Sequence, residues 1–186
     1  MTDERGDLGD NADLAALIRT IPDYPKPGIQ FRDITTLLLD AQGFGRCIDR
    51  MAAQVADLKP DLIAGIEARG FIFGAALAHK LGCGLLLVRK KNKLPGAVLG
   101  INYALEYGQD RIEMHADACT PGARVLVVDD LIATGGTALA TVQLLAQAGA
   151  EVLGAAFVID LPDLGGADRL RARGLRVDAL LGFAGD

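Results

Sequence analysis

The chain has 186 residues, of which 51% are hydrophobic and 23% charged, and its 24 acidic and 19 basic side chains give a formal net charge of -5. A chain of this length fits one domain and can bury a core without disulfides or a structural metal. The acidic balance argues against a general nucleic-acid binder, which is normally basic. We therefore expect a globular protein without a nucleic-acid partner, in which a local basic cluster would serve a small anion.

The three cysteines, Cys47, Cys83 and Cys119, are scattered and form no C-x-x-C pair. Neither a disulfide framework nor a zinc site is indicated. No charged leader with an apolar core begins the chain, and no apolar run approaches the roughly 18 residues of a membrane span. The expectation is a cytoplasmic protein with no membrane association.

The N-terminal part of the chain predicts a short tail and two helices. Residues 1–11 are polar and acidic, so we expect a poorly ordered tail. Apolar residues then recur at helical spacing from Leu14 to Ile21, which predicts a helix that Pro22 stops. The YPKPG run from 24 to 28 predicts an irregular loop, because each proline restricts the residue before it. A clearer amphipathic helix is predicted from Phe44 to Leu58.

From Asp61 onward the pattern alternates between strands and helices. The predicted strands are 62–66, 85–88, 125–128, 152–159 and 177–181, and the predicted helices are 71–81, 137–148 and 167–173. This rhythm predicts an α/β fold with a doubly wound, mainly parallel sheet. One long excursion, residues 90–121, interrupts it, and excursions of this length are more often functional than idle.

Three charged segments follow three of these strands. They are residues 67–70 (EARG), 89–91 (RKK) and the pair Asp129 and Asp130. In a doubly wound sheet, ligands bind outside the carboxyl ends of the strands. The segments are therefore expected to converge on one crevice.

The most informative stretch is VLVVDDLIATGGTA, residues 125–138. It reads as a buried strand, two carboxylates, and a turn of glycines and threonines that opens a helix. Glycines allow close approach of a ligand, threonines add donors, and the amino end of a helix suits a phosphate.

Three interpretations of this stretch compete. An ordinary glycine turn after an acidic strand end is one. A nucleoside triphosphatase would need a G-x-x-x-x-G-K-[ST] loop, and a dinucleotide fold a G-x-G-x-x-G turn, and the chain has neither. The third interpretation is a site for a ribose 5-phosphate group, which we favour.

Five strings in order carry a family resemblance: YPKPGIQFRDIT (24–35), GIEARGFIFG (65–74), VRKKNKLPG (88–96), YALEYG (103–108) and VVDDLIATGGT (127–137). Together they resemble the type I phosphoribosyltransferases, and in particular those that act on adenine. The resemblance implies a small N-terminal hood (about 12–40) and a flexible catalytic loop (about 90–121) on a single domain of residues 12–186. It also implies conversion of adenine and phosphoribosyl diphosphate to AMP and diphosphate in purine salvage.

The resemblance also implies a magnesium ion and a homodimer. The magnesium would be bound through the substrate, with Asp129 and Asp130 reaching it through water if they contact it. The homodimer would use the apolar surface near Phe71 and Phe73.

Roles for individual residues follow from the resemblance together with their chemistry. Asp129 and Asp130 would bind the ribose hydroxyls, and the 5-phosphate would lie against Ala133, Thr134, Gly135, Gly136 and Thr137. Guanidinium and ammonium groups bind phosphate oxygens, so the candidates for the diphosphate are Arg69, Arg89, Lys90 and Lys93. Lys91 is interpreted as solvated. Asn92 stands where the family often has glycine, which bears on the path of this basic loop.

The adenine site is expected in the hood. The resemblance places the base against Phe31, with main-chain atoms of Gln30 and Arg32 at its edge. Glu106 would take and return the purine N7/N9 proton, and Tyr107 would help to exclude water. The expected catalytic residues are thus Glu106, Arg69, Asp129 and Asp130.

Two other functions stay open at this point. A transferase for guanine, hypoxanthine or xanthine needs a donor at the 6-oxo group, often a lysine, and no lysine follows Asp130 in this chain. A regulator that senses phosphoribosyl diphosphate without catalysis would need a nucleic-acid module or a basic face. Both alternatives are disfavoured by these features.

Overall fold

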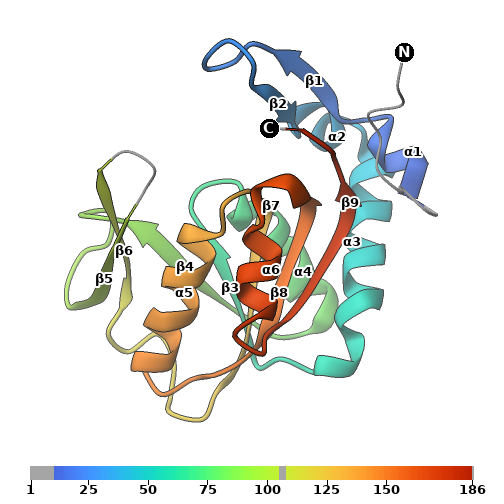
Figure 1. Cartoon of the computed structure of the whole chain (residues 1–186). Helices are drawn as coiled ribbons and strands as arrows, with labels where there is room; N and C mark the ends of the chain where they lie inside the picture. The colour runs from blue at the N-terminus through green and yellow to red at the C-terminus, as the bar shows by residue number, and fades with distance from the viewer. Residues whose placement is uncertain (1–10, 105–107, 186) are drawn as a thin grey trace.

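The computed structural model describes residues 11–104 and 108–185. Its centre is a seven-stranded sheet in the order β5-β6-β4-β3-β7-β8-β9 (Figure 1). Neighbouring strands from β4 to β9 run parallel, and β5 and β6 add an antiparallel edge. The predicted doubly wound, mainly parallel α/β fold is confirmed. The strands are β3 (Leu62–Ile66), β4 (Gly84–Lys90), β5 (Val98–Ala104), β6 (Gln109–His115), β7 (Arg124–Ile132), β8 (Glu151–Asp160) and β9 (Arg176–Gly182).

Helices cover both faces of this sheet (Figure 1). The helices α3 (Ala41–Val55) and α4 (Gly70–Leu81) lie on one face, and α5 (Gly136–Gln147) and α6 (Gly166–Arg171) lie on the other. Alternate residues of β7 enter two separate cores: Leu126 and Val128 pack on the α3 and α4 side, and Val125 and Val127 on the other. A strand buried on both faces has no polar alternation, which is why this run is continuously apolar.

The helix ends follow local signals in the sequence. Asp40 caps α3, because its carboxylate accepts from the Gly43 N–H at 2.6 Å. The chain leaves α4 through Gly82 at φ 72, a left-handed conformation that favours glycine. The predicted helix 44–58 becomes α3 plus a short 3-10 turn, η2 (Ala56–Leu58). A second 3-10 turn, η3 (Pro162–Leu164), precedes α6.

The N-terminal segment differs from its prediction. The helix expected up to Ile21 ends early, because α1 covers only Ala12–Ala15 and Arg19–Pro22 forms strand β1. Strand β1 pairs antiparallel with β2 (Gln30–Asp33), with Ile21 opposite Phe31. Leu14 and Ile18 are buried, whereas Ile21 is only partly so. The β-branched residues Thr20 and Ile21 favour a strand. The hydrogen-bonded pairing of β1 with β2 therefore outweighs the helical spacing of the apolar residues.

The strands β1 and β2, with α2 (Thr35–Leu39), stand above one end of the main sheet beside the C-terminal end of the chain (Figure 1). Arg32 ties these two parts together. Its Nη2 donates to the Ala184 carbonyl at 3.0 Å, and its guanidinium lies 4.7 Å from the Phe183 ring centre.

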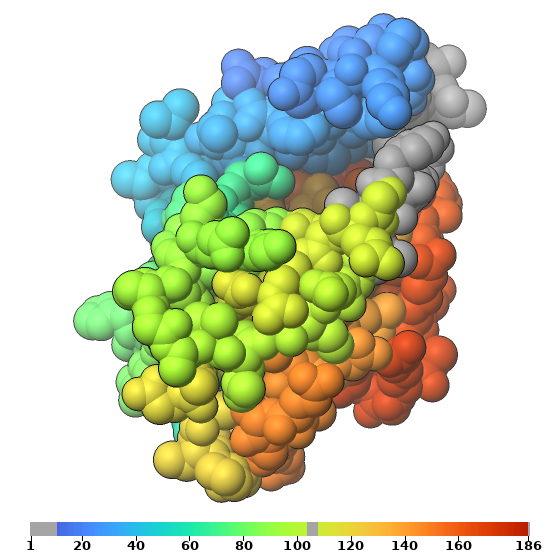
Figure 2. Space-filling model, turned by 90° about the vertical axis from the view of Figure 1, so that its left-hand side faces the viewer, coloured from blue at the N-terminus to red at the C-terminus, as the bar shows by residue number. Residues whose placement is uncertain are grey.

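Much of the excursion from 90 to 121 is a β-ribbon. Strands β5 and β6 pair along their length, from Val98 opposite His115 to Ala104 opposite Gln109, and β6 continues the sheet beside the end of β4. In Figure 2 the ribbon forms a wall below the blue N-terminal segment, with a recess between them. Within residues 11–104 and 108–185, no helix is long and apolar enough to cross a membrane.

Candidate active site

The loop between β7 and α5 is held from outside by the start of α6. Gly135 has φ 80, and a Cβ on it would lie 3.0 Å from the backbone of Gly166. The Gly166 N–H donates to the Ala133 carbonyl at 3.0 Å, and Arg169 Nη1 donates to the Thr134 carbonyl at 2.9 Å. These contacts fix a tight turn whose inner side is left for a ligand.

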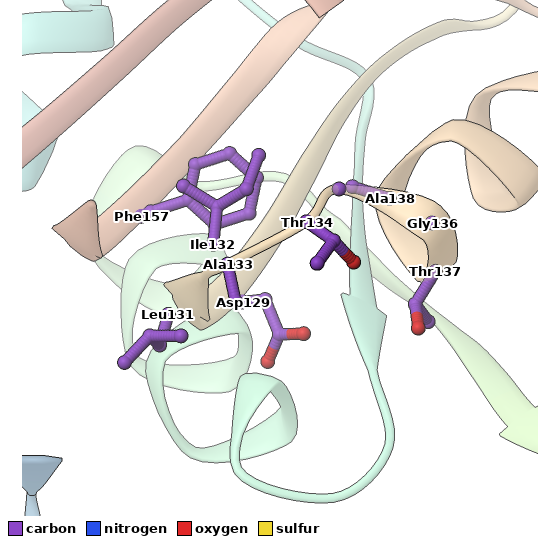
Figure 3. Close-up of a pocket in the computed structure, with 10 residues that line it drawn as sticks. Asp129, Leu131, Ile132, Ala133, Thr134, Gly136, Thr137, Ala138 and Phe157 are labelled. Atoms are coloured by element: carbon purple, nitrogen blue, oxygen red, sulfur yellow. The ribbon is translucent and has the colours of Figure 1, made fainter. Parts of the chain in front are cut away.

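A cavity of about 140 Å³ lies inside this turn. Figure 3 shows the carboxylate of Asp129 and the hydroxyls of Thr134 and Thr137 on one side of the loop, with Ile132 and Phe157 on the other. The first N–H groups of a helix have no carbonyl partner one turn earlier, and they carry partial positive charge. The cavity therefore offers donors for an anion beside a carboxylate for hydroxyl groups. Its lining comprises Asp129, Leu131, Ile132, Ala133, Thr134, Gly135, Gly136, Thr137, Ala138 and Phe157.

The two carboxylates at the end of β7 have different surroundings. Asp130 is buried and forms an ion pair with Arg69 Nε. The Asp130 N–H donates to Asp129 Oδ1 at 2.9 Å. Burial raises the pKa of Asp129 well above its usual value, and the nearby charge of Asp130 raises it further. The pair therefore holds its negative charge at a cost that a cation or hydroxyl donors would relieve.

The segment 67–70 approaches these carboxylates closely, and its Glu67–Ala68 peptide is cis. A Cβ on Gly70 would lie 2.8 Å from Asp129 Oδ1 and 2.8 Å from the Val128 carbonyl, so only glycine fits. Burial alone would lower the pKa of Arg69, but its hydrogen bond to Asp130 and the charges of Asp130, Asp129 and Asp33 outweigh this and raise it. Arg69 stays charged at the rim.

The end of β4 supplies two more cations, which Glu67 holds in place. Arg89 Nε donates to Glu67 Oε2 at 3.2 Å, and the Lys90 N–H donates to the same oxygen at 2.8 Å. Burial opposes the charge of Glu67, but the hydrogen bonds from Lys90 and Arg89 outweigh it and lower the pKa of Glu67. Arg89 also donates to the Lys93 carbonyl at 3.0 Å.

The Lys90 side chain points to the β-ribbon. Its Nζ donates to the Tyr103 hydroxyl at 2.8 Å and forms an ion pair with Asp110. The Thr137 hydroxyl donates to the same Tyr103 oxygen at 3.1 Å. The basic end of β4 is thereby connected to the first turn of α5.

The basic loop after β4 accommodates Asn92 in a glycine-like conformation. Asn92 has φ 63, in the left-handed region where asparagine is the best tolerated substitute for glycine. Its N–H donates to Glu113 Oε2 at 3.0 Å. The asparagine therefore meets the backbone demand that a glycine would meet here. Lys93, one residue on, is exposed, and its charge helps to lower the pKa of Glu67.

In the hood, Phe31 lies on β2 and meets Tyr24 edge to face, with ring centres 5.2 Å apart. Arg32 is buried by its contacts with the C-terminal end, so its side chain is structural while its main chain stays on β2. β2 is one of two strands in this small sheet, with β1 as its partner. The charge of Asp33, at the end of β2, also contributes to the raised pKa of Arg69.

The predicted residues Glu106 and Tyr107 lie outside the described residues, as does the tail up to residue 10. Among the described residues, no group of three or more His, Cys, Asp or Glu side chains could hold a metal by itself. A magnesium ion here would need most of its oxygen ligands from substrate and water.

Sequence reasoning missed the groups that hold the cations. Glu67, Tyr103 and Asp110 had no assigned role, although Glu67 precedes Arg69 by two residues and Asp110 lies opposite Tyr103 across the ribbon. Leu131 and Phe157 were also missed, and both line the cavity. The sequence does show complementary charges at the strand ends, but they can be paired only once the order of the strands in the sheet is known.

Comparisons of this chain with known proteins all point to one family. A family model described as the phosphoribosyl transferase domain matches residues 35–175. The adenine phosphoribosyltransferase of Sphingopyxis alaskensis is 60% identical over 174 residues, which are 94% of this chain and 95% of that protein. The one from Azorhizobium caulinodans is 58% identical over 173 residues, covering 93% of this chain and 97% of that protein.

Solved structures agree with this result. The crystal structure of adenine phosphoribosyltransferase from Rhodothermus marinus has a TM-score of 0.87 at 48% identity, covering 92% of this chain and 97% of that chain. The Saccharomyces cerevisiae enzyme, in complex with an imino-altritol bisphosphate and adenine, has a TM-score of 0.85 at 37% identity. The match covers 91% of this chain and 97% of that chain. This chain belongs to the phosphoribosyltransferase family, and within it to the adenine phosphoribosyltransferases.

Proposed function

We propose that the cavity at the end of β7 holds the 5-phosphoribosyl group while it passes from diphosphate to N9 of adenine. The observation that carries this proposal is the arrangement in Figure 3, where Asp129 faces the same side as the hydroxyls at the start of α5. A sugar phosphate has an anion at one end and vicinal hydroxyls at the other, and this cavity offers a partner for each. The 5-phosphate would lie against Ala133, Thr134, Gly135, Gly136 and Thr137.

The chemistry separates two charges. Breaking the anomeric C–O bond leaves positive charge on the ribose ring and negative charge on diphosphate, so catalysis requires that both be stabilised. Asp129 and Asp130 stand on the ribose side. Arg69, Arg89, Lys90 and Lys93 stand on the diphosphate side, where guanidinium groups bind phosphate oxygens in pairs.

Magnesium fits this donor set only as a partner of the substrate. Asp129 and Asp130 would contact its water ligands, because Asp130 is already paired with Arg69. When bound, the ion would neutralise diphosphate oxygens and so make diphosphate a better leaving group.

The base would stack on Phe31, with main-chain atoms of Gln30 and Arg32 at its edge. Support comes from the place of Phe31 on β2 and from its aromatic neighbour Tyr24. Adenine has an amino group at position 6, which can donate a hydrogen bond to a main-chain carbonyl, so no lysine is needed there. No lysine follows Asp130 in the sequence, in keeping with adenine over a 6-oxopurine.

Glu106 is proposed to take the purine N7/N9 proton in the forward direction and return it in reverse, with Tyr107 excluding water. Glu106→Leu should lower kcat by at least 100-fold, which is the lower range of general acid–base contributions. Near-normal turnover in a folded variant would overturn this role. We further propose a single domain, residues 12–186, with a small hood of about residues 12–40 and a flexible catalytic loop within about residues 90–121.

We also propose a cytoplasmic homodimer. The three cysteines are unpaired thiols, as expected in a reducing compartment. Of the apolar surface expected near Phe71 and Phe73, Phe73 itself cannot take part, because it is 0% exposed, whereas Phe71 is only partly buried. An apolar patch formed by Ile72, Leu85 and Leu87, each about two-fifths exposed, is the better candidate. Leu85→Glu should shift the mass measured by light scattering from dimer to monomer, and an unchanged dimer would exclude this patch.

The decisive test of function is an assay with each purine alone. The protein is incubated with magnesium, phosphoribosyl diphosphate and either adenine, guanine, hypoxanthine or xanthine, and nucleotide formation is followed. AMP should form at least 100-fold faster than the other nucleotides, as expected when a site built for one hydrogen-bond pattern rejects another. Binding without turnover would instead favour a sensor of phosphoribosyl diphosphate. In crystals with AMP, the phosphoryl oxygens should lie against the amides around Gly135.

A further inference from the structure

The hydroxyl of Tyr103 lies between the two groups proposed to bind the two ends of phosphoribosyl diphosphate. It accepts hydrogen bonds from Lys90 Nζ at 2.8 Å and from Thr137 Oγ1 at 3.1 Å. It donates to Asp110 Oδ2 at 3.1 Å. Thr137 opens the helix at the proposed 5-phosphate site, whereas Lys90 ends the strand on the proposed diphosphate side.

The hydrogen bonds of this hydroxyl are fully used. A phenol hydroxyl has one proton to donate and two lone pairs to accept with. Tyr103 donates its proton to Asp110 and accepts from Lys90 and Thr137. The phenol is also fixed by its strand, because Tyr103 pairs with Asp110 across the β-ribbon. The Lys90 ammonium lies 5.5 Å from the centre of the same ring. Few rearrangements are open to a group with this many partners.

The ammonium of Lys90 is left with one free donor. It has three N–H groups, of which one goes to Asp110 and one to Tyr103. Burial alone would lower the pKa of Lys90, but its bonds to Asp110 and Tyr103 outweigh this and raise it, so the group stays charged. Its remaining N–H is therefore held in one direction relative to α5.

We propose that Tyr103 is a positioning residue that sets the spacing between Thr137 and Lys90 and so favours a ligand that bridges the two subsites. This inference rests on the proposed function. A ligand with two anionic ends gains affinity from a fixed spacing, because once one end is bound the second contact forms with little further loss of entropy. A ligand that fills only one subsite gains nothing from the spacing. Tyr103 would thus discriminate for phosphoribosyl diphosphate over AMP or diphosphate bound singly.

The test compares three ligands on the intact protein. Affinities of phosphoribosyl diphosphate, AMP and diphosphate, each with magnesium, are measured by calorimetry for the wild type and for Tyr103→Phe, which keeps the ring and removes the hydroxyl. We expect about a tenfold loss for phosphoribosyl diphosphate and less than twofold for each of the others, a coupling within the usual range between two sites. KM for phosphoribosyl diphosphate should rise with the calorimetric value.

Two further variants keep the test independent of folding. Asp110→Asn removes the charge that holds Lys90 from the other side, and it should give the same pattern with a smaller loss. Asn102→Ala is the matched control, because Asn102 is exposed on the same strand next to Tyr103. It should leave all three affinities unchanged.

The outcomes separate the two claims. If Tyr103→Phe weakens phosphoribosyl diphosphate by no more than the product of its effects on AMP and diphosphate, the spacing role is refuted while the proposed function stands. If the wild type binds neither AMP nor phosphoribosyl diphosphate, the proposed function fails, and the spacing role fails with it.

Discussion

The loop proposed to bind the 5-phosphate (the 5-phosphate loop) and the side of the site proposed to bind diphosphate (the diphosphate side) are built in opposite ways. The loop is one contiguous segment, residues 133–137, whose shape comes from backbone geometry and from Gly166 pressed against it. The diphosphate side gathers Arg69, Arg89 and Lys90 from separate segments, and each of them is already paired with a carboxylate. Backbone N–H groups need no counter-ion, whereas a cluster of cations does.

This difference predicts different sensitivities. Substitutions at the loop should act through space and shape, and substitutions on the diphosphate side should act through charge. The Arg69 and Asp130 pair belongs to both, since Asp130 continues β7 into the loop. The largest effects are therefore expected at this junction.

Asp130→Ala should have the largest effect. It removes a carboxylate proposed to bind the ribose and leaves Arg69 without its partner. Losing one member of a buried, hydrogen-bonded ion pair lowers the free energy of unfolding by about 3 to 5 kcal/mol. Because Arg69 is half exposed, we expect the lower end of this range for stability. Removing one group that stabilises developing charge typically lowers the rate by about 100- to 1,000-fold, so kcat/KM should fall at least 100-fold. Steady-state kinetics at saturating adenine measures it. Asp130→Asn, which keeps the shape, should lose less, and a fall below fivefold for the alanine variant would contradict the assignment.

Gly70→Ala should come next, through shape alone. Its Cβ would meet Asp129 Oδ1 and the Val128 carbonyl at 2.8 Å, so the carboxylate or the strand must move. Overpacking of this kind lowers the free energy of unfolding by about 1 to 3 kcal/mol, so the melting temperature should fall. Because the Asp129 carboxylate would be displaced, we also expect kcat/KM to fall about tenfold. Gly45→Ala is the matched control, because a Cβ there has nothing within 4 Å. It should leave activity unchanged and stabilise α3 by about 0.5 to 1 kcal/mol.

Glu67→Gln tests the charged side and should depend on pH. The pKa of Glu67 is lowered in the folded protein from its ordinary value of 4.5. The stabilisation is therefore complete above pH 4.5 and is lost as the pH falls through the lowered pKa, because the unfolded chain takes up the proton first. At pH 7 the free energy of unfolding of the wild type should exceed that of Glu67→Gln by about 1 kcal/mol. Thermal melts from pH 7 to 3 should show this margin shrinking, and a margin independent of pH would exclude the ionic role.

The local form of the proposed 5-phosphate loop could be predicted from sequence because its strand, carboxylates, glycines and helix start lie within fourteen residues, whereas its contacts with Gly166 and Arg169 of α6 could not. Strand, carboxylates, glycines and helix start follow one another, and each has a local physical meaning. The diphosphate side was predicted only in part. Arg69, Arg89 and Lys90 were identified by charge, but their partners Glu67, Tyr103 and Asp110 become neighbours only through the order of the strands.

The errors in the fold have a related cause. Leu14, Leu17 and Ile18 fit a helical period, and the period was extended to Ile21, which pairs with β2 instead. The resemblance implies an apolar surface near Phe71 and Phe73, whereas the turn of α4 carries Phe73 into the core and leaves Ile72 exposed. Periodicity reports which residues share a face, but which face is covered depends on packing that lies elsewhere in the chain.

Arg169→Ala should have the smallest effect and gives the sharpest test of the contrast. Arg169 is a cation at the 5-phosphate loop, yet it lies outside the cavity and donates to the Thr134 carbonyl at 2.9 Å. If the loop works through backbone shape, losing this exposed hydrogen bond should weaken AMP binding only about two- to fivefold, the worth of one net hydrogen bond, and leave diphosphate binding unchanged. Calorimetry with both ligands measures this.

Arg171→Ala is the control on the same helix, since Arg171 bonds Asp168 and the Val177 carbonyl and does not reach the loop. It should change neither affinity. A loss of diphosphate binding in Arg169→Ala as large as the loss of AMP binding would mean that the guanidinium acts through its charge on the whole site. The loop would then depend on countercharge as the diphosphate side does, and the contrast between the two regions would be wrong.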